Sequence, residues 1–171
     1  MTGALLVGGA SARFGSPKAL APFAGLTLAE RAWQALEFCD ERLAVGKAED
    51  ELGLPFPVLD DGTDVRAPIA GVAAALRLAR NDVVLVLPVD TPRVDRAALL
   101  ALAAACRDAA VPQTGPLPGA YRRSALPALE RRLAAGELSL RRVLDELDVS
   151  IVRIDPDLLV NVNTPDDLAR L

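Results

Sequence analysis

The sequence predicts an α/β protein with a mostly parallel, mixed sheet covered by helices on both faces. The first observation is that short apolar runs alternate with stretches of helical apolar spacing through residue 107. This alternation is typical of right-handed βαβ units. The second is that the early apolar runs are continuous, as in strands buried on both faces. The third is a less regular second part with candidate hairpin and edge strands, which predicts a mixed sheet.

The elements of the first 107 residues follow from local patterns. Thr27 with Glu30 three residues later predicts a helix N-cap with a capping box. Pro68 suits a helix entry, and Asp95 is a typical N-cap. Val83–Leu87 is the clearest strand, because no polar residue interrupts it. The expected strands are 4–7, 42–45, 55–59 and 83–87, the expected helices are 28–38, 69–78 and 96–107, and residues 19–23 and 47–52 are expected as a short extended segment and a short surface helix.

The second part contains shorter elements. Proline and glycine between residues 112 and 118 predict a loop or hairpin tip. Ser139 is expected to cap a helix, and Asn163-Thr164-Pro165 to open the last one. No repeat or long linker divides the chain, so one domain, residues 1–171, is expected. The expected strands are 109–111, 119–121 and 149–154, the expected helices are 124–133, 139–147 and 166–171, and residues 159–162 form a short apolar segment.

The length and composition suit one domain with a sizeable, aliphatic core. The chain has 171 residues, of which 51% are hydrophobic and only 4% aromatic. Its apolar runs are far shorter than the roughly 20 residues of a membrane span. The N-terminus lacks the pattern of a signal peptide, so a cytoplasmic protein without membrane association is expected. The net charge of −4 argues against a general nucleic-acid binder.

The residue types that are absent narrow the chemistry. The chain has no histidine, which excludes a Ser-His-Asp triad, a histidine base and histidine-ligated zinc. Cys39 and Cys106 lie far apart in apolar stretches and are expected to be buried free thiols. Carboxylates, lysine, arginine, hydroxyls, backbone amides and a hard cation remain as the chemical groups of a site.

A glycine-rich loop follows the first apolar run and carries Arg13 and Lys18. Glycine lets backbone N–H groups approach a ligand closely, and with two cations this suits a polyanion such as a nucleoside triphosphate. Taken alone, the loop also fits a surface turn with solvated charges. It is neither a Walker A motif nor a dinucleotide fingerprint, because Gly8 and Gly9 are adjacent and no Gly-Lys-Ser/Thr closes it.

Polar residues and glycines gather where the predicted parallel strands end. The glycine loop, Gly46, Asp60-Asp61 and Asp90 each follow a strand, and ligands of open α/β sheets bind at that edge. This placement favours a nucleotide site. Asp90 suits Mg²⁺, which takes one or two carboxylates and completes its shell with water and phosphate oxygens; capping a turn or helix is an equal alternative. Asp60-Asp61-Gly62 is also a common turn sequence.

Five motifs in order resemble those of the MobA family, the molybdenum cofactor guanylyltransferases. The segment LVGGASARFGSPK at 6–18 looks like the family's L-A-G-G-x-S-x-R-M-G-x-x-K. PIAG at 68–71 resembles G-P-L-A-G, PVDTP at 88–92 resembles P-C-D-T-P, and GAYRRS at 119–124 resembles G-L-Y-R-R-S. NVNTP at 161–165 matches N-V-N-T-P. The first motif alone indicates only the wider nucleotidyltransferase fold, and NVNTP together with Asp90-Thr91-Pro92 makes the narrower family resemblance specific.

The resemblance implies a Rossmann-like three-layer sandwich of the nucleotide-diphospho-sugar transferase type. It implies transfer of GMP from GTP to molybdopterin with release of pyrophosphate, dependent on Mg²⁺, with possible molybdopterin-delivery or molybdoenzyme-maturation proteins as partners. Catalytic roles are implied for Arg13, Lys18 and Asp90, with Asp90 as the metal ligand and Asn161 and Asn163 on the molybdopterin side. The nucleotide-binding residues it implies are Leu6, Val7, Gly8, Gly9, Ser11, Lys18, Asp61 and Asp90.

Three positions depart from the family pattern. Val7 replaces Ala, Phe14 replaces Met, and Gly46 stands where the family often has Asn. Related cytidylyltransferases carry R-F-G, so Phe14 is similar to them, whereas Gly8-Gly9 and the motif at 90–92 favour guanine. Transfer of CMP, or transfer to a sugar or other small-molecule phosphate, is therefore an alternative of the same class. A non-catalytic nucleotide-binding module is the alternative of another class.

Overall fold

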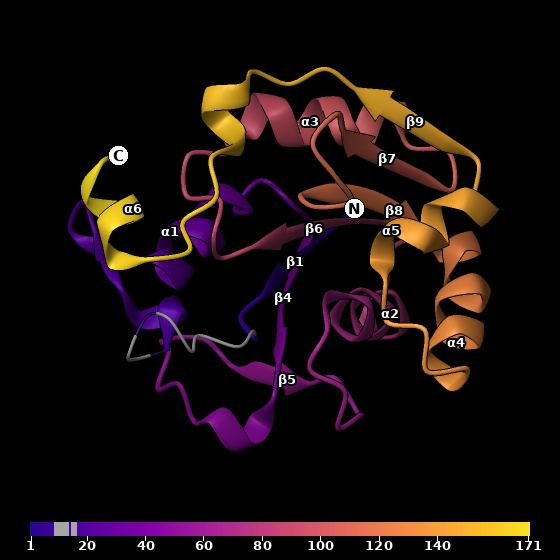
Figure 1. The fold of residues 1–171 in the computed structure, drawn as a ribbon, viewed down its shortest axis with the longest axis horizontal. Helices are drawn as coiled ribbons and strands as arrows, with labels where there is room; N and C mark the ends of the chain where they lie inside the picture. The colour runs from indigo at the N-terminus through magenta and orange to yellow at the C-terminus, as the bar shows by residue number, and fades with distance from the viewer. Residues whose placement is uncertain (9–13, 15–16) are drawn as a thin grey trace.

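The computed structural model of the protein describes residues 1–8, 14 and 17–171, and within them a seven-stranded sheet forms the centre (Figure 1). The strand order is β5-β4-β1-β6-β8-β7-β9. β8 pairs antiparallel with β6 and β7, and the other neighbours pair in parallel. The predicted mostly parallel mixed sheet is therefore confirmed. The strands are β1 (Thr2–Leu6), β4 (Glu41–Gly46), β5 (Val58–Asp60), β6 (Val83–Pro88), β7 (Ala109–Pro112), β8 (Gly119–Arg122) and β9 (Val149–Val152).

Helices cover both faces of this sheet, which makes three layers. The helices are α1 (Leu28–Ala35), α2 (Pro68–Leu78), α3 (Arg96–Ala105), α4 (Leu126–Ala134), α5 (Leu140–Val143) and α6 (Pro165–Ala169). α1 and α3 share one apolar cluster with one side of the strands, and α2, α4 and α5 share a second cluster with the other side. Successive strand residues point to opposite faces, so Leu5 belongs to the first cluster and Leu6 to the second.

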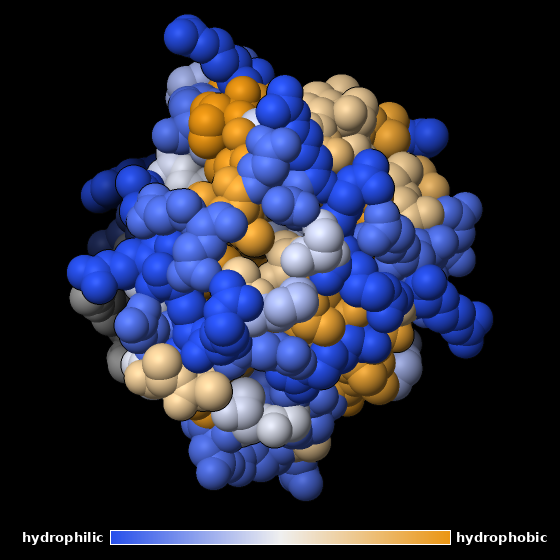
Figure 2. Space-filling model, turned by 90° about the vertical axis from the view of Figure 1, so that its right-hand side faces the viewer, coloured by the Kyte–Doolittle hydropathy of each residue, from blue (hydrophilic) through white to orange (hydrophobic). Residues whose placement is uncertain are grey.

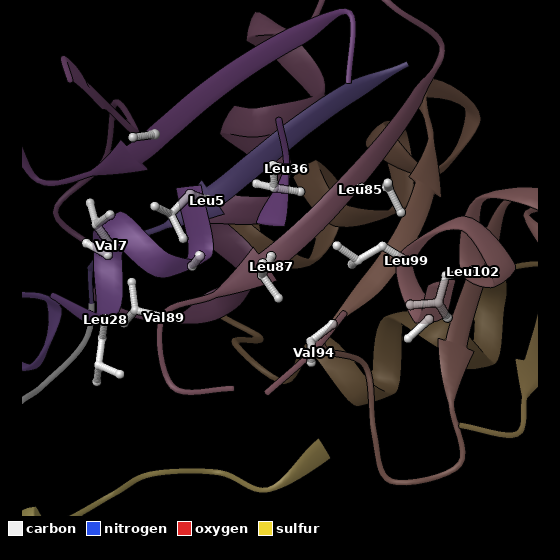
Figure 3. Packing of buried hydrophobic residues seen from close by; sticks show 14 of the residues in the cluster. Leu5, Val7, Leu28, Leu36, Leu85, Leu87, Val89, Val94, Leu99 and Leu102 are labelled. Atoms are coloured by element: carbon white, nitrogen blue, oxygen red, sulfur yellow. The ribbon is translucent and has the colours of Figure 1, made fainter. Parts of the chain in front are cut away.

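The cluster under α1 and α3 is built from aliphatic side chains, as the composition predicts. The cluster includes Leu5, Leu87 and Leu85 from neighbouring strands, with Leu36 near Leu5, Leu28 near Val7 and Val89, and Leu99 near Leu85 (Figure 3). These side chains are almost fully buried. Full burial of each leucine contributes roughly 1.5–3 kcal/mol, so this layer fixes where the ends of β1 and β6 lie.

Two of the three predicted N-caps, Thr27 and Asp95, are confirmed. The Thr27 hydroxyl accepts from the Glu30 N–H (3.1 Å) and the Glu30 carboxylate accepts from the Thr27 N–H (2.8 Å), which completes the capping box of α1. The Glu30 carboxylate accepts from the Thr27 N–H and also from the Thr27 hydroxyl (2.8 Å), and these two bonds lower its pKa. The Asp95 carboxylate accepts from the Ala98 N–H (2.8 Å) at the start of α3.

Other element boundaries differ from the predictions. Residues 19–23 are not one extended segment: Lys18–Leu20 is a 3₁₀ turn, and β2 (Pro22–Phe23) forms a hairpin with β3 (Leu26–Thr27). Ala24 and Gly25 both have positive φ, the backbone of a tight hairpin turn. The predicted strand 55–59 is limited to β5, because prolines at 55 and 57 have no N–H to donate to the ladder.

Four further helix predictions need correction. α1 ends at Ala35 and α3 at Ala105, each before the expected end. Ser139 occupies an N-cap position but makes no side-chain capping bond, and the helix after it is only α5 followed by a 3₁₀ turn, Leu144–Glu146. The expected helix at 47–52 is a single 3₁₀ turn, Ala48–Asp50. The apolar segment near 159 begins as another 3₁₀ turn, Pro156–Leu159.

Both thiols are free. Cys106 is buried, as predicted, whereas Cys39 is only half-buried. Burial raises the pKa of each thiol to about 11. Because the thiolate is the reactive form, neither cysteine suits nucleophilic chemistry at neutral pH.

The surface of the molecule on the side of α4 and α5 is mostly polar. Figure 2 shows hydrophilic side chains over most of this face, with hydrophobic groups in separate small areas between them. Within residues 1–8, 14 and 17–171, no helix has the length and apolarity needed to cross a membrane.

Candidate active site

A cavity of about 380 Å³ opens where β1, β4 and β6 end. The carboxyl ends of parallel strands are where open α/β sheets bind ligands. Its walls come from segments far apart in the sequence, which only the crossovers of the fold bring together. The lining comprises residues 6–8, 45–47, 65–68 and 88–90 together with Lys18, Asp61, Gly71, Leu117 and Asn161.

Most of the residues predicted from the sequence meet at this cavity. Asn163 does not line it, but its Oδ1 accepts a hydrogen bond from Lys18 Nζ at 3.5 Å. The predictions for Gly9, Ser11 and Arg13 fall outside the described residues. The predicted residues that line the cavity are Leu6, Val7, Gly8, Lys18, Asp61, Asp90 and Asn161.

Lys18 connects two predicted parts of the site. It begins the 3₁₀ turn after the glycine loop, and its Nζ lies 3.6 Å from Asp90 Oδ2. The same ammonium group lies 3.5 Å from Asn163 Oδ1. One cation therefore stands between the carboxylate at the end of β6 and the amide of the C-terminal segment.

The backbone around Asp90 is held on both sides. The Asp90 carbonyl accepts from the Val162 N–H at 2.8 Å, which ties the C-terminal segment to the end of β6. The Thr91 hydroxyl donates to the Pro88 carbonyl at 3.3 Å. Burial raises the pKa of the Asp90 carboxyl, and the nearby Lys18 ammonium acts in the opposite direction. A desolvated carboxylate at the mouth of an anion-binding cavity is poorly satisfied by the protein alone.

We expect Asp90→Asn to raise the melting temperature of the ligand-free protein at pH 7. The pKa of Asp90 is raised on folding, so ionising this carboxylate lowers stability as pH rises from its ordinary value of 3.8 to the raised one. The amide removes this cost. The gain should therefore be present at pH 7 and absent at pH 3, as measured by calorimetry. An equal gain at both pH values would contradict the assigned cause.

A buried ion pair between Lys47 and Asp61 lines the cavity next to the end of β4. Lys47 Nζ lies 2.7 Å from Asp61 Oδ1, and each side chain is only 7% exposed. The ammonium also donates to the Thr63 carbonyl, and the Thr63 N–H donates to Asp61 Oδ1 at 3.1 Å. The Asp61 N–H donates to the Gly46 carbonyl at 3.0 Å. These bonds fix the loop after β5 against the end of β4.

Lys47 is a site residue that the sequence prediction missed. It was expected in a surface helix, but it is buried and lines the cavity. A fully buried lysine is rare unless it is paired, and its partner lies 14 residues away. The signal available in the sequence was weak: both residues directly follow a strand of the same parallel pair.

The departures at Val7 and Gly46 are sterically linked. A Cβ added to Gly46 would lie 2.8 Å from Val7 Cγ2 and 3.3 Å from a methyl of Val58. Real Cβ atoms do not approach so closely, so the valine methyl group occupies the space that a side chain at position 46 would need. The Val7 side chain, directly after β1, therefore fills the space left by the missing side chain at 46, and Asn at 46 would require a smaller residue at 7.

We expect Gly46→Ala to destabilise the protein by about 1–3 kcal/mol, the usual cost of overpacking. Val7→Ala in the same chain should restore most of this loss, because it removes the colliding methyl groups. Urea denaturation of the wild type, both single variants and the double variant measures the coupling. Additive effects of the two substitutions would show that the positions are independent.

Arg66 adds a third cation to the cavity wall. Its guanidinium lies 2.6 Å from Glu49 Oε1 and 2.9 Å from Asp50 Oδ1 at an exposed position. These hydrogen bonds raise its pKa. Lys18, Lys47 and Arg66 line the cavity together with two carboxylates, Asp61 and Asp90, so the described lining carries a net positive charge. This charge suits an anionic ligand despite the net negative charge of the chain.

No cluster of three or more metal-ligating side chains occurs among the residues that the structure describes. The described residues therefore do not indicate a site for zinc or for another metal that needs several protein ligands. The donor set does fit Mg²⁺, because Asp90 offers one hard carboxylate and Mg²⁺ commonly takes its remaining ligands from water and phosphate oxygens.

Comparison with known proteins places the chain among nucleotidyltransferases. Residues 3–151 match the family described as MobA-like NTP transferase domain. A protein of Deinococcus radiodurans named probable molybdenum cofactor guanylyltransferase is 36% identical, and the match covers 100% of this chain and 93% of that protein. A Bacillus subtilis protein with the same name is 32% identical, with 98% and 92% covered.

Solved structures agree with this placement. Molybdopterin-guanine dinucleotide biosynthesis protein A from Archaeoglobus fulgidus superposes with a TM-score of 0.84 at 28% identity, covering 99% of this chain and 96% of that one. The 2-C-methyl-D-erythritol 4-phosphate cytidylyltransferase from Thermus thermophilus has a TM-score of 0.75 at 22% identity, covering 98% and 95%. The second likeness shows the shared fold alone.

Proposed function

The chain belongs to the MobA-like NTP transferase family, and on this premise we propose that it transfers GMP from GTP to molybdopterin and releases pyrophosphate. The observation that carries the proposal is the end-to-end similarity to proteins named molybdenum cofactor guanylyltransferase. The cavity supports it, because a strand-end site with three surrounding cations suits a nucleoside triphosphate.

The reaction needs little covalent chemistry from the protein. An oxygen of the terminal phosphate of molybdopterin attacks the α-phosphorus of GTP in line. The bond from the α-phosphorus to the bridging oxygen breaks, and pyrophosphate leaves with the electron pair. The acceptor phosphate is already ionised at neutral pH, so no general base is required. Positioning and neutralisation of charge therefore carry the rate, which is consistent with a chain without histidine.

The residues at the end of β6 and after the glycine loop would handle the phosphates. We propose that Asp90 holds Mg²⁺, which supplies charge neutralisation at phosphate oxygens when it is bound. Lys18 would contact the triphosphate from beside Asp90. We propose the same phosphate role for Arg13, and contacts with the nucleotide for Gly9 and Ser11.

The two ends of the cavity would receive the two substrates. Leu6, Val7 and Gly8 would contact the guanosine through their backbone, and Asp61, which lines the same cavity, would also contact the nucleotide. Asn161 and Asn163 would lie toward molybdopterin, since the C-terminal segment closes the side near Lys18. A cytoplasmic location, and contact with molybdopterin-delivery or molybdoenzyme-maturation proteins, are proposals that follow from the same role.

Equilibrium titration with GTP, CTP and UTP in the presence of Mg²⁺ tests the choice of nucleotide. The proposal predicts that GTP binds most tightly. Preference for CTP would favour the cytidylyltransferase alternative. Tight GTP binding without pyrophosphate release in the presence of molybdopterin would favour a binding module without catalytic activity.

A further inference from the structure

The two oxygens of the Asp61 carboxylate, which lines the cavity, differ in their hydrogen-bond partners. Oδ1 accepts from Lys47 Nζ at 2.7 Å and from the Thr63 N–H at 3.1 Å. Within residues 1–8, 14 and 17–171, no hydrogen bond to Oδ2 is found. Because Asp61 lines the cavity, Oδ2 is the oxygen through which this side chain can accept a hydrogen bond from a ligand.

The orientation of this carboxylate depends on Lys47. The loop backbone is anchored separately, since the neighbouring Asp60 accepts from the Ala48 N–H (2.9 Å) and the Gly62 N–H (2.7 Å). The side chain of Asp61, in contrast, is held by the ammonium group and one amide. Lys47 is buried to the same extent as its partner, since each side chain is 7% exposed. The pair is also neutral overall, so it does not repel a triphosphate.

We propose that Lys47 is a positioning residue for base recognition: it holds Asp61 so that Oδ2 accepts hydrogen bonds from the donor edge of a purine that carries N1–H and a 2-amino group. This inference rests on the proposed function. Guanine has adjacent donors on that edge, whereas cytosine and adenine present a ring acceptor beside their amino group. A carboxylate oxygen that a cation holds in place therefore favours guanine. With cytosine or adenine, this oxygen would face a ring nitrogen that is itself a hydrogen-bond acceptor.

A purely structural role for Lys47 makes a different prediction. In that case its loss would lower stability and weaken all nucleotides alike, because the cavity floor would be disturbed without any change in selectivity. Selectivity among bases is thus the readout that separates the two roles. ITP is the sharpest probe, because it differs from GTP only in lacking the 2-amino group.

The test uses Lys47→Met, Asp61→Asn and the double variant of the full chain. Methionine keeps much of the length and packing of the lysine stem. The dissociation constants of GTP, ITP and CTP are measured by titration for each protein. We expect each single variant to reduce the preference for GTP over ITP and CTP by about tenfold, the value of a hydrogen bond to a charged group. The double variant should lose no more than either single one.

Arg107→Met is the matched control. Arg107 also pairs with a carboxylate, Asp148 at 3.0 Å, but at the amino end of β7 and at an exposed position. Its substitution should leave all three dissociation constants unchanged.

A folded Lys47→Met protein that keeps the full preference for GTP would overturn the inference. If this variant does not fold, the double variant decides, because it leaves no unpaired buried charge; an unchanged preference there would also overturn it. A wild type without any preference for GTP would contradict the proposed function itself. These outcomes therefore distinguish a failure of the inference about Lys47 from a failure of the proposed function.

Discussion

Replacing Asp90 by alanine is expected to reduce the rate of guanylyl transfer by about a thousandfold, which corresponds to about 4 kcal/mol of barrier. Asp90 is the carboxylate at the end of β6 that lines the cavity, and burial already raises its pKa. In the proposed site it is the protein ligand of Mg²⁺. Its loss should remove the dependence of the rate on Mg²⁺ over the concentration range that saturates the wild type.

The fold should survive this substitution. The backbone of Asp90 is held by its carbonyl bond to the Val162 N–H, which does not involve the side chain. Initial rates at several Mg²⁺ concentrations and circular dichroism of the same sample check both parts. Wild-type activity in folded Asp90→Ala protein would exclude the metal role.

Replacing Lys18 by alanine is expected to weaken GTP binding by about 10- to 100-fold, the range for a hydrogen bond between charged groups. The lysine ammonium lies at the cavity wall beside Asp90. Without it, the Asp90 carboxylate loses a cation that lowers its pKa, and the triphosphate loses a counter-charge. Binding of guanosine, which has no phosphate, should change little.

Comparison of GTP with guanosine makes this test specific. A loss confined to GTP indicates a phosphate contact, and an equal loss for both ligands would indicate a disturbed cavity. Unchanged GTP binding would remove Lys18 from the site. Isothermal titration of both ligands against the wild type, the variant and Arg107→Met provides the measurement and its control.

The elements with strong local signals were predictable from the sequence. Val83–Leu87 is a continuous apolar run and becomes the centre of β6. Thr27 and Glu30 satisfy backbone groups within their own helix turn, so their capping box needs no distant partner. Elements whose ends depend on tertiary contacts were less predictable. The hairpin of β2 and β3 requires positive φ at Ala24, a residue type that gives no turn signal.

The residues of the candidate site also differ in how far the sequence alone predicts them. Asp90 could be named because ligand-binding residues of α/β sheets follow the strands. Asp61 also follows a strand, but its nucleotide role was implied by the family resemblance. Lys47 could not be named, because its burial is produced by an ion pair with Asp61 that forms only when β4 and β5 are side by side. The link between Val7 and Gly46 was equally hidden, since a distance between two strand ends decides it.

The most direct test of the proposed function is release of pyrophosphate from each nucleoside triphosphate in the presence of Mg²⁺ and molybdopterin. We predict that GTP gives pyrophosphate and a guanine dinucleotide of molybdopterin in equal amounts, and that CTP and UTP give little of either. Product formation from CTP in preference to GTP, or GTP binding without any pyrophosphate release, would contradict the proposal.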